Sequence, residues 1–288
     1  MVTRLGPFVF LLAALFQGRG ETPALATEFP FRFSQGLLCV EVRAPQRSKP
    51  LNFLLDSGAN VSVLNSSIAR ELGVKTGKKM IVQGVNATLR GYMSKPFSLE
   101  MDMLQLPQHY FVVDLHKLSG IDENRVDGLL GVDFFRGRSV QIDYAMGKIR
   151  LGTPVPPTGA IIPLNVLSSG TILLSASINN NHGEWFRLDT GCASSLQWFQ
   201  ERSRANSQIS NPSVGLTRPR ILQTFTSVQA GPVCFERVPT GLHSKRIFPG
   251  EAGLIGNGLL SRYESITIDM SSGRLILGKS RPQNAPGL

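Results

Sequence analysis

The chain has little charge and few cysteines and histidines. Charged residues make up 17% of its 288 residues, and it contains three cysteines and four histidines. Apolar residues make up 42%, with 29 glycines and 18 prolines, which argues against a disordered chain and favours a compact, turn-rich, mainly β protein. The four histidines, His109, His116, His182 and His243, show no spacing typical of metal ligands, so we expect no metal and no other cofactor.

Motifs of several other enzyme classes are absent. The sequence contains no Gly-x-Ser-x-Gly nucleophile elbow and no phosphate-binding loop, which argues against a serine hydrolase of that type and against a nucleotide-binding enzyme. The formal net charge is +10, but the basic residues are scattered and no aromatic residues alternate with them. We interpret them as a solvated basic surface and expect no nucleic-acid partner.

Residues 1–26 have the pattern of a secretory signal peptide. Arg4 precedes an apolar run from Leu5 to Phe16, and Ala24-Leu25-Ala26 resembles a small-x-small cleavage site. The apolar run is short for a bilayer span, and no second long apolar run follows it. We expect an exported protein, periplasmic or extracellular, without a stable membrane anchor.

Three cysteines in an exported chain allow one disulfide and leave one thiol over. Cys192 and Cys234 both lie in the second half of the chain, and Cys234 lies in an apolar stretch that we expect to form a strand. We predict a disulfide between these two residues and a free Cys39. The alternative is that all three are reduced and pack as small apolar residues.

Two short runs carry the strongest signal in the chain. The first reads Phe-Leu-Leu-Asp-Ser-Gly-Ala over residues 53–59, and the second reads Phe-Arg-Leu-Asp-Thr-Gly-Cys over residues 186–192. A Gly-Leu-Leu-Gly run starts 72 residues after the first Asp (128 − 56), and Gly-Leu-Ile-Gly starts 64 residues after the second (253 − 189). A single such triplet is most often a surface turn, but two in register predict two carboxylates, Asp56 and Asp189, that face each other.

The ends of the two halves also correspond. Asp143 and Gly152 in the first half match Asp269 and Gly278 in the second, with an offset of 126 at both points (269 − 143 and 278 − 152). We therefore predict an internal duplication. The expected organisation is a first half over residues 27–152, a Pro-rich linker over 153–159, a second half over 160–280 and a tail over 281–288.

The apolar pattern predicts strands for most of both halves. We expect hairpins from residues 37–42 with 51–55, 171–178 with 185–188, 79–83 with 88–92, and within 142–151 and 266–277. Short helices are predicted after each Asp turn, over residues 68–72 and 196–202, because serines that can cap a helix precede both. We interpret Asp143 and Asp269 as turn residues whose carboxylates accept hydrogen bonds from nearby backbone N–H groups.

Two carboxyl groups a few ångströms apart suit the hydrolysis of amide bonds by water. They cannot both ionise cheaply, so they share one proton, and each serves in turn as acid and base. The Ser57 and Thr190 hydroxyls are expected to brace the opposing turns. Gly58 and Gly191 keep side chains out of a crowded two-fold axis. These patterns indicate an aspartic peptidase acting on polypeptides.

The two Asp turns, together with the run Gly-Leu-Leu-Gly-Val-Asp-Phe-Phe over residues 128–135, resemble the retropepsin-like aspartic protease family, in its bacterial exported form. The matches span roughly residues 33 to 278. The resemblance implies an all-β fold of two closed retropepsin-like domains in a pepsin-like, two-lobed arrangement with short helices. It also implies Asp56 and Asp189 as the catalytic pair and a flap hairpin over the cleft. We place the flap at Gly84 and Val85, and residues 214–225 are the matching stretch of the second half. Tyr92 and Phe225 each lie 36 residues past their Asp (92 − 56 and 225 − 189), and they either contact substrate or take part in ordinary packing.

Two alternatives stay open at this stage. One is a catalytically inactive peptide-binding protein that keeps the fold, although both Asp residues are present. The other is an assembly in which each half pairs with its copy in another chain. We expect a monomer in which the two halves form an intramolecular pseudo-dimer.

Overall fold

The structure is a computed structural model, and it describes residues 27–45, 47–84, 87–102, 104–115, 126–152, 159–201 and 222–281. The expected signal peptide and most of the expected linker and tail lie outside these ranges. Within them, no helix has the length and apolar character needed to cross a bilayer.

Strands dominate both halves. The elements of the first half are β1 (Thr27–Pro30), β2 (Arg32–Ser34), β3 (Leu37–Val42), β4 (Leu51–Leu55), β5 (Val63–Asn65), α1 (Ser66–Glu71), β6 (Thr76–Gly84), β7 (Ala87–Ser94), β8 (Glu100–Met101), β9 (Leu104–Gln105), β10 (Phe111–Val113), β11 (Gly128–Leu130), α2 (Val132–Phe135), β12 (Ser139–Asp143) and β13 (Lys148–Gly152). Those of the second half are β14 (Ala160–Val166), β15 (Ile172–Ile178), β16 (Glu184–Asp189), β17 (Leu196–Phe199), β18 (Leu222–Ala230), β19 (Val233–His243), β20 (Gly253–Gly256), α3 (Asn257–Leu260), β21 (Ser265–Asp269) and β22 (Arg274–Leu277).

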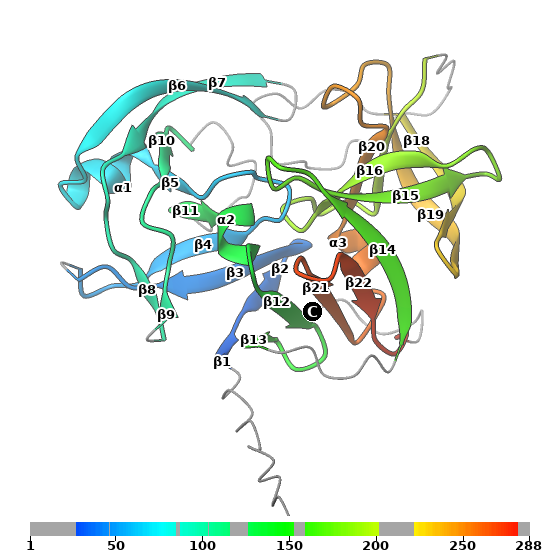
Figure 1. The fold of residues 1–288 in the computed structure, drawn as a ribbon, viewed down its shortest axis with the longest axis horizontal. Helices are drawn as coiled ribbons and strands as arrows, with labels where there is room; N and C mark the ends of the chain where they lie inside the picture. The colour runs from blue at the N-terminus through cyan, green and yellow to red at the C-terminus, as the bar shows by residue number, and fades with distance from the viewer. Residues whose placement is uncertain are drawn as a thin grey trace, which may run out of the picture.

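Two large sheets organise these strands into two lobes. The first lobe contains an 8-stranded sheet in the order β2-β3-β4-β11-β5-β10-β7-β6. A 12-stranded sheet, in the order β1-β13-β12-β21-β22-β14-β15-β16-β20-β17-β19-β18, forms the second lobe and also carries strands of the first half. In Figure 1 the 8-stranded sheet lies on the left, strands β15–β20 lie on the right, and β1, β12, β13, β21 and β22 lie below them. The predicted all-β, two-lobed fold is confirmed.

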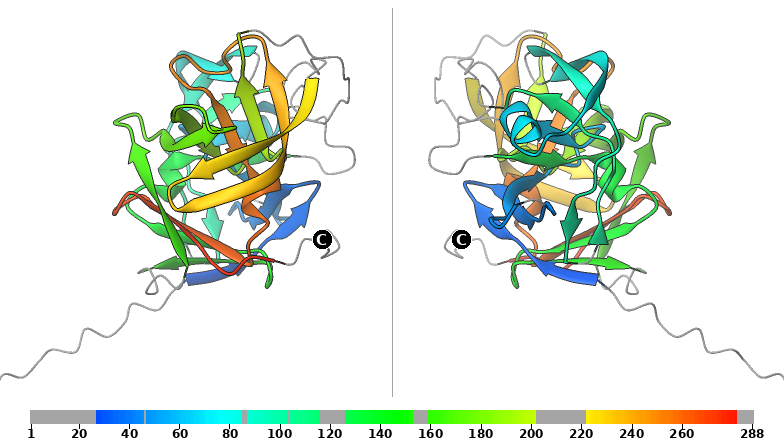
Figure 2. Two further views of the ribbon diagram at one scale, coloured as in Figure 1. Left: turned by 90° about the vertical axis from the view of Figure 1, so that its right-hand side faces the viewer. Right: turned by 90° about the vertical axis from the view of Figure 1, so that its left-hand side faces the viewer.

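The shared part of the large sheet joins the two halves directly. Strand β12 pairs antiparallel with β21, so that Val140 lies opposite Ile268 and Ile142 lies opposite Ile266. All four side chains are fully buried and belong to one apolar cluster that extends into both lobes. Both views in Figure 2 show this sheet at the end of the molecule opposite the β6–β7 hairpin. The base of the molecule is therefore a common core of both halves.

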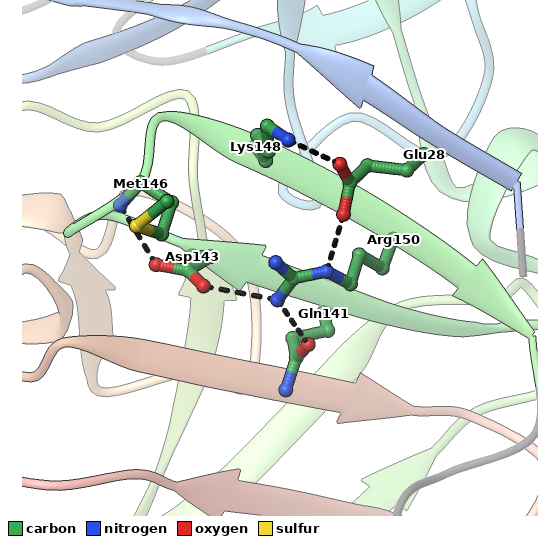
Figure 3. Close-up of polar contacts among 6 residues, drawn as sticks. All are labelled: Glu28, Gln141, Asp143, Met146, Lys148 and Arg150. Carbon is green, nitrogen blue, oxygen red and sulfur yellow. Dashed lines mark hydrogen bonds and ion pairs between the residues drawn. The ribbon is translucent and has the colours of Figure 1, made fainter.

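A polar network fastens strand β1 to the edge of the shared sheet (Figure 3). The Glu28 carboxylate accepts from Lys148 Nζ at 2.5 Å and from Arg150 Nε at 2.6 Å. Arg150 Nη1 also donates to Asp143 Oδ2 at 2.9 Å and to Gln141 Oε1 at 3.1 Å. Exposed ion pairs each contribute little, so we attribute to this network the register of β1 on β13 rather than a large part of the stability.

Most of the predicted hairpins are present, with strand ends close to those expected. Asp143 accepts from Met146 N–H at 2.9 Å, and Asp269 accepts from Ser271 and Ser272 N–H, both at 3.1 Å, which confirms that both are turn residues. Helix α1 is present, with Asn65 rather than a serine as its N-cap.

The predicted helix over residues 196–202 is wrong, since its described part forms strand β17. Leu196 pairs with both Ile255 of β20 and Thr240 of β19. Leu196 and Trp198 are buried. The two neighbouring strands supply hydrogen bonds that a local capping signal cannot match.

Candidate active site

Asp56 and Asp189 each follow directly from a strand buried in a sheet. Asp56 follows β4, and Asp189 is the last residue of β16. Strand β11 pairs in parallel with β4, and β20 pairs in parallel with β16. These two strands carry the Gly-Leu-Leu-Gly and Gly-Leu-Ile-Gly runs and are called the glycine-flanked strands. Each lies behind the Asp turn of its own half, as predicted. The Asp56 N–H donates to the Leu130 carbonyl at 2.9 Å, which anchors the first turn to the sheet.

The structure brings the two carboxyl groups together from the two halves. Both side chains line one cavity, and each carboxyl lies against the glycine of the opposite turn. The N–H groups of Gly58 and Ala59 donate to Asp56 Oδ1, both at 3.0 Å, and the Gly191 N–H donates to Asp189 Oδ1 at 2.9 Å. Each carboxyl is therefore held by its own turn while it faces the carboxyl of the other half.

The two predicted bracing hydroxyls cross between the halves. Ser57 Oγ donates to the Leu188 carbonyl at 2.8 Å and accepts from the Thr190 N–H at 3.0 Å. Thr190 Oγ1 donates to the Leu55 carbonyl at 2.8 Å and accepts from the Ser57 N–H at 2.9 Å. Both residues are buried, with exposed fractions of 1% and 0%. Four buried hydrogen bonds thus lock the two turns to each other.

The two glycines of the turns are required by close approach. A Cβ on Gly58 would lie 2.4 Å from Asp189 Cγ, and a Cβ on Gly191 would lie 2.4 Å from Asp56 Cγ. Any side chain at either position would displace the carboxyl of the opposite half. These contacts agree with the predicted role of both glycines.

Burial and mutual charge raise the pKa of both carboxyl groups. Burial raises the pKa of Asp189 well above its ordinary value, and the negative charge of Asp56 raises it further. Burial also raises the pKa of Asp56, although hydrogen bonds from Ala59 and Gly58 oppose the rise. Burial therefore favours the protonated form of both carboxyls.

Both carboxyl residues line a cavity of about 340 Å³. The β6–β7 hairpin borders the cavity with Val82, Gln83, Gly84 and Leu89. The other lining residues are Gly58, Ala59, Asn60, Val61, Val63, Phe111, Leu129, Arg187, Phe248, Pro249 and Glu251. The first half supplies most of the apolar side chains of the cavity, and the second half supplies the Arg187–Glu251 ion pair beside Phe248 and Pro249.

The hairpin lies where a flap was expected, but Tyr92 and Phe225 do not border the cavity. Gly84 lines it, and Val85 lies outside the described residues. Tyr92 is 45% exposed, because alternation along β7 turns it to the face opposite Leu89. Phe225 is 63% exposed on β18, where its ring lies 5.4 Å from the Arg237 guanidinium. The equal sequence separation of Tyr92 and Phe225 from their Asp residues therefore did not predict that they would line the cavity.

Arg187 and Glu251 form a buried ion pair in the cavity lining. The sequence analysis did not predict this pair. Arg187 Nε and Nη2 donate to the two Glu251 carboxylate oxygens at 2.9 and 2.5 Å. Arg187 Nη1 donates to the Gly58 carbonyl of the first half at 2.8 Å. A signal was available, because Arg187 stands between the apolar residues Phe186 and Leu188, at a position whose counterpart in the first half, residue 54, is leucine.

Two further buried polar groups support the turns. Asn257 Nδ2 donates to the Thr190 carbonyl at 2.6 Å and to the Gly36 carbonyl at 2.9 Å, so it links the second turn to the first half. In the first half, Asp133 accepts from the Ser62 hydroxyl at 2.6 Å and from the Ser62 N–H at 3.0 Å. Asn257 directly follows β20, and Asp133 lies three residues past the end of β11. Their place close behind these two strands is the signal that the sequence offered for them.

The predicted disulfide between Cys192 and Cys234 is wrong, since all three cysteines are free. Cys192 is buried beside Ile247 and Leu254, directly after the second turn. Cys234 is exposed near the start of β19, and its thiol donates to Glu236 Oε1 at 3.2 Å. Sequence spacing does not reveal on which face of a strand a thiol lies, and the two sulfurs here have opposite environments.

A second hollow does not compete with the site. It has a volume of about 460 Å³ and is lined by residues of β1 to β4 with Met101 and Asp102, none of which belongs to the carboxyl pair. Within the described ranges, no group of three or more His, Cys, Asp or Glu side chains is arranged to hold a metal ion.

Comparisons with known proteins agree with this geometry. Residues 40–134 match a family model described as aspartyl protease. The structure is similar to the crystal structure of an aspartic proteinase from Irpex lacteus, with a TM-score of 0.62 and 15% sequence identity over 90% of this chain and 99% of that chain. No curated protein matches the sequence significantly.

The match of residues 40–134 includes the first Asp turn and the glycine-flanked strand behind it, and the structural likeness extends over both lobes. At this level of identity the likeness shows the fold, which is that of the two-lobed, pepsin-like aspartic proteinases. The two findings together agree with the predicted resemblance over residues 40–134 and with the predicted two-lobed fold.

Proposed function

We propose that this chain is an aspartic endopeptidase in which Asp56 and Asp189 share one proton and activate a water molecule against a peptide bond. One observation carries the proposal: carboxyls from two different halves lie together in the lining of a cavity that a β-hairpin borders, each against the glycine of the opposite turn. The aspartyl protease match over residues 40–134 supports the same chemistry.

The proposed reaction uses each carboxyl as both acid and base. The ionised carboxylate takes a proton from water while the water oxygen bonds to the peptide carbonyl carbon, and the protonated carboxyl gives its proton to the carbonyl oxygen. The resulting diol returns a proton to the pair. The pair then protonates the amide nitrogen, the C–N bond breaks, and one shared proton remains for the next cycle.

The surroundings of the two carboxyls favour a division of roles in the resting state. Asp56 accepts two backbone N–H hydrogen bonds on one oxygen, which stabilise a negative charge. The pKa of Asp189 is raised by burial and by the charge of Asp56, so Asp189 favours the protonated form. Because the two interact, the pair titrates as a unit and the roles exchange during the reaction.

The proposal is tested with Asp56→Asn and Asp189→Asn, each assayed on a mixed peptide library across acidic and neutral pH. Each variant is expected to lose cleavage while it keeps the far-UV circular dichroism of the parent. Asp143→Asn is the matched control, because Asp143 accepts a hydrogen bond in a turn outside the cavity. The double Asp variant should be no less active than either single variant, since residues that act as one unit are not additive.

The outcomes distinguish an aspartic peptidase from an inactive peptide-binding protein and from a metal peptidase. Near-normal turnover in either single Asp variant would show that the pair is not the catalytic group. Binding of a transition-state mimic by the parent without any cleavage would favour an inactive peptide-binding protein instead. Loss of cleavage on addition of a chelator would point to a metal peptidase and contradict the proposal.

We further propose a polypeptide substrate, export from the cell and a monomeric state. Export is supported by the leader pattern of residues 1–26, and the monomer by the pairing of β12 with β21 within one chain. The mass and the N-terminal sequence of the protein recovered from its cells or their medium test both. A chain that retains residues 1–26, or a mass of two chains, would contradict them.

A further inference from the structure

Arg187 is a buried cation, whereas the equivalent strand position of the first half holds the apolar residue Leu54. Leu54 and Arg187 each lie two residues before the Asp of their half, and each pairs with the middle of the strand behind it, at Leu129 and Leu254. Leu54 packs in an apolar cluster with neighbours such as Leu37 and Cys39. Arg187 cannot pack in that way, although it is only 7% exposed. The two halves are therefore unlike at this position.

Two residues of the second half hold the Arg187 guanidinium in place. The Glu251 carboxylate accepts two hydrogen bonds from its Nε and Nη2, at 2.9 and 2.5 Å. The Phe248 ring centroid lies 3.7 Å from Arg187 Cζ, so the ring covers one face of the guanidinium. Glu251 is itself fixed, because Arg246 Nη1 donates to its backbone carbonyl at 2.7 Å. A two-point hydrogen bond and a stacked ring leave the guanidinium little freedom to move.

The remaining contact of Arg187 reaches across to the first half. Its Nη1 donates to the Gly58 carbonyl at 2.8 Å. The N–H of the same Gly58 donates to Asp56 Oδ1 at 3.0 Å, and its Cα faces the Asp189 carboxyl so closely that no Cβ fits. A shift of Gly58 would therefore move the N–H that donates to Asp56 and the Cα that lies against the Asp189 carboxyl.

A buried ion pair is weak evidence for a role in stability. Replacing both partners by uncharged groups is often neutral for stability, whereas removing one partner leaves a costly buried charge. A charge at this position therefore calls for another explanation, and the contact with the first Asp turn supplies one.

We propose that Arg187, held by Glu251 and Phe248, is a positioning residue that fixes the Gly58 peptide of the first half and so sets the geometry of the Asp56–Asp189 pair. The proposal rests on the proposed peptidase function for its kinetic consequences. Its structural part, that Arg187 holds the turn of the first half, can be tested without activity.

The charge of Arg187 also acts on the pair. Burial raises the pKa of both Asp56 and Asp189, and the Arg187 guanidinium opposes that rise in both. The charged groups around the guanidinium among the described residues are this pair, Glu251, and Arg246 on the far side of Glu251. Removing the guanidinium should therefore raise both pKa values of the pair, in addition to releasing Gly58.

The experiment compares E251Q with R187M/E251Q, because these two variants differ only at Arg187 and neither leaves an unpaired buried carboxylate. Relative to E251Q, the double variant is expected to lose kcat by roughly 10- to 100-fold, the range produced when a reacting group is displaced by about 1 Å. KM should change by less than about threefold, since the lost interaction supports chemistry rather than binding. Both limbs of the pH profile of kcat/KM should move to higher pH.

Two more variants complete the comparison. R187K keeps the charge but cannot bind Glu251 and Gly58 at once, so it should restore the pH limbs and only part of kcat. R138M is the matched control, because Arg138 also stacks on a phenylalanine, Phe134, and donates to its backbone carbonyl at 3.0 Å, outside the cavity. R138M should leave kcat, KM and both limbs unchanged.

A second readout, deuterium uptake of the peptide covering residues 55–63, reports the hold on Gly58 directly. Uptake should rise in R187M/E251Q relative to E251Q and stay at the parent level in R138M. Unchanged uptake would overturn the proposal, and so would a loss confined to KM with unmoved pH limbs, which would make Arg187 a substrate contact. If the parent shows no cleavage that depends on Asp56, the proposed function fails, and the uptake comparison alone decides whether Arg187 holds the turn.

Discussion

Removal of the Thr190 hydroxyl is the sharpest test of how the two halves are joined. Thr190 has no exposed surface, and its Oγ1 donates to the Leu55 carbonyl at 2.8 Å and accepts from the Ser57 N–H at 2.9 Å. Thr190→Val keeps the shape of the side chain and removes both hydrogen bonds. The substitution leaves one buried carbonyl and one buried N–H without their partner.

Each orphaned buried group costs about 1–3 kcal/mol, so the loss of partners for two groups should lower the free energy of unfolding by about 2–6 kcal/mol. With a urea slope of about 2–3 kcal/mol per M, the midpoint should fall by about 1–3 M. Thr190→Ser keeps the hydroxyl and should cost less than about 1.5 kcal/mol, the value for one buried methyl group. Urea unfolding monitored by tryptophan fluorescence measures all three proteins.

Thr226→Val is the matched control. Thr226 is also buried, and its hydroxyl pairs at 2.8 Å with that of Thr240, which keeps a second partner in the Val238 carbonyl at 2.9 Å. Its loss should cost about 1 kcal/mol, since no backbone group is orphaned. A Thr190→Val cost no larger than that of Thr226→Val would refute the reasoning that hydroxyls crossing between the halves hold the turns together.

Three further predictions concern the site and its surroundings. Because burial and the Asp56 charge raise the pKa of Asp189, its protonated form contributes stability that is fully present below about pH 4 and is lost as pH rises through the folded-state pKa. Asp189→Asn should therefore gain stability relative to the parent from about pH 4 upward, and a pH-independent difference in urea midpoints would contradict the shift. Cys234 is the one exposed cysteine, so a thiol reagent should modify one thiol per native chain and three after unfolding; three in the native state would contradict the burial of the others. Gly191→Ala should lower kcat on the order of 100-fold by displacing Asp56, whereas Gly77→Ala, whose Cβ meets nothing closer than 3.5 Å, should not; equal kcat values would contradict the clash.

Much of the fold could be predicted because its signals are local. A hairpin such as β12–β13 alternates apolar and polar residues and turns between an Asp and a glycine, Asp143 and Gly147, so its own sequence specifies it. The meeting of Asp56 and Asp189 was also predictable, because a repeated motif in a repeated fold must return to the same place about a two-fold axis.

Features that depend on distant partners were not predictable. Strand β17 carries a local capping pattern, yet pairing with β19 and β20 decides its conformation. The pairing of β12 with β21 depends on how the halves dock, which no single segment encodes. Arg187 was visible as an anomaly in an apolar strand, but its partner Glu251 lies 64 residues away in the chain, so only the structure shows their contact.

The unequal lining of the cavity has a consequence for the direction in which a peptide binds. A cavity with exact two-fold symmetry would accept a chain equally well from either end, because rotation would exchange the two orientations. Here the apolar side chains of Val63, Phe111 and Leu129 lie in the first half, and the Arg187–Glu251 pair lies in the second. In a site that cleaves peptides as proposed, this contrast gives the bound chain a preferred polarity. The structure of a complex with one asymmetric peptide would report that polarity: one orientation is expected, and two equally occupied orientations would show that the two ends of the cavity are not distinguished.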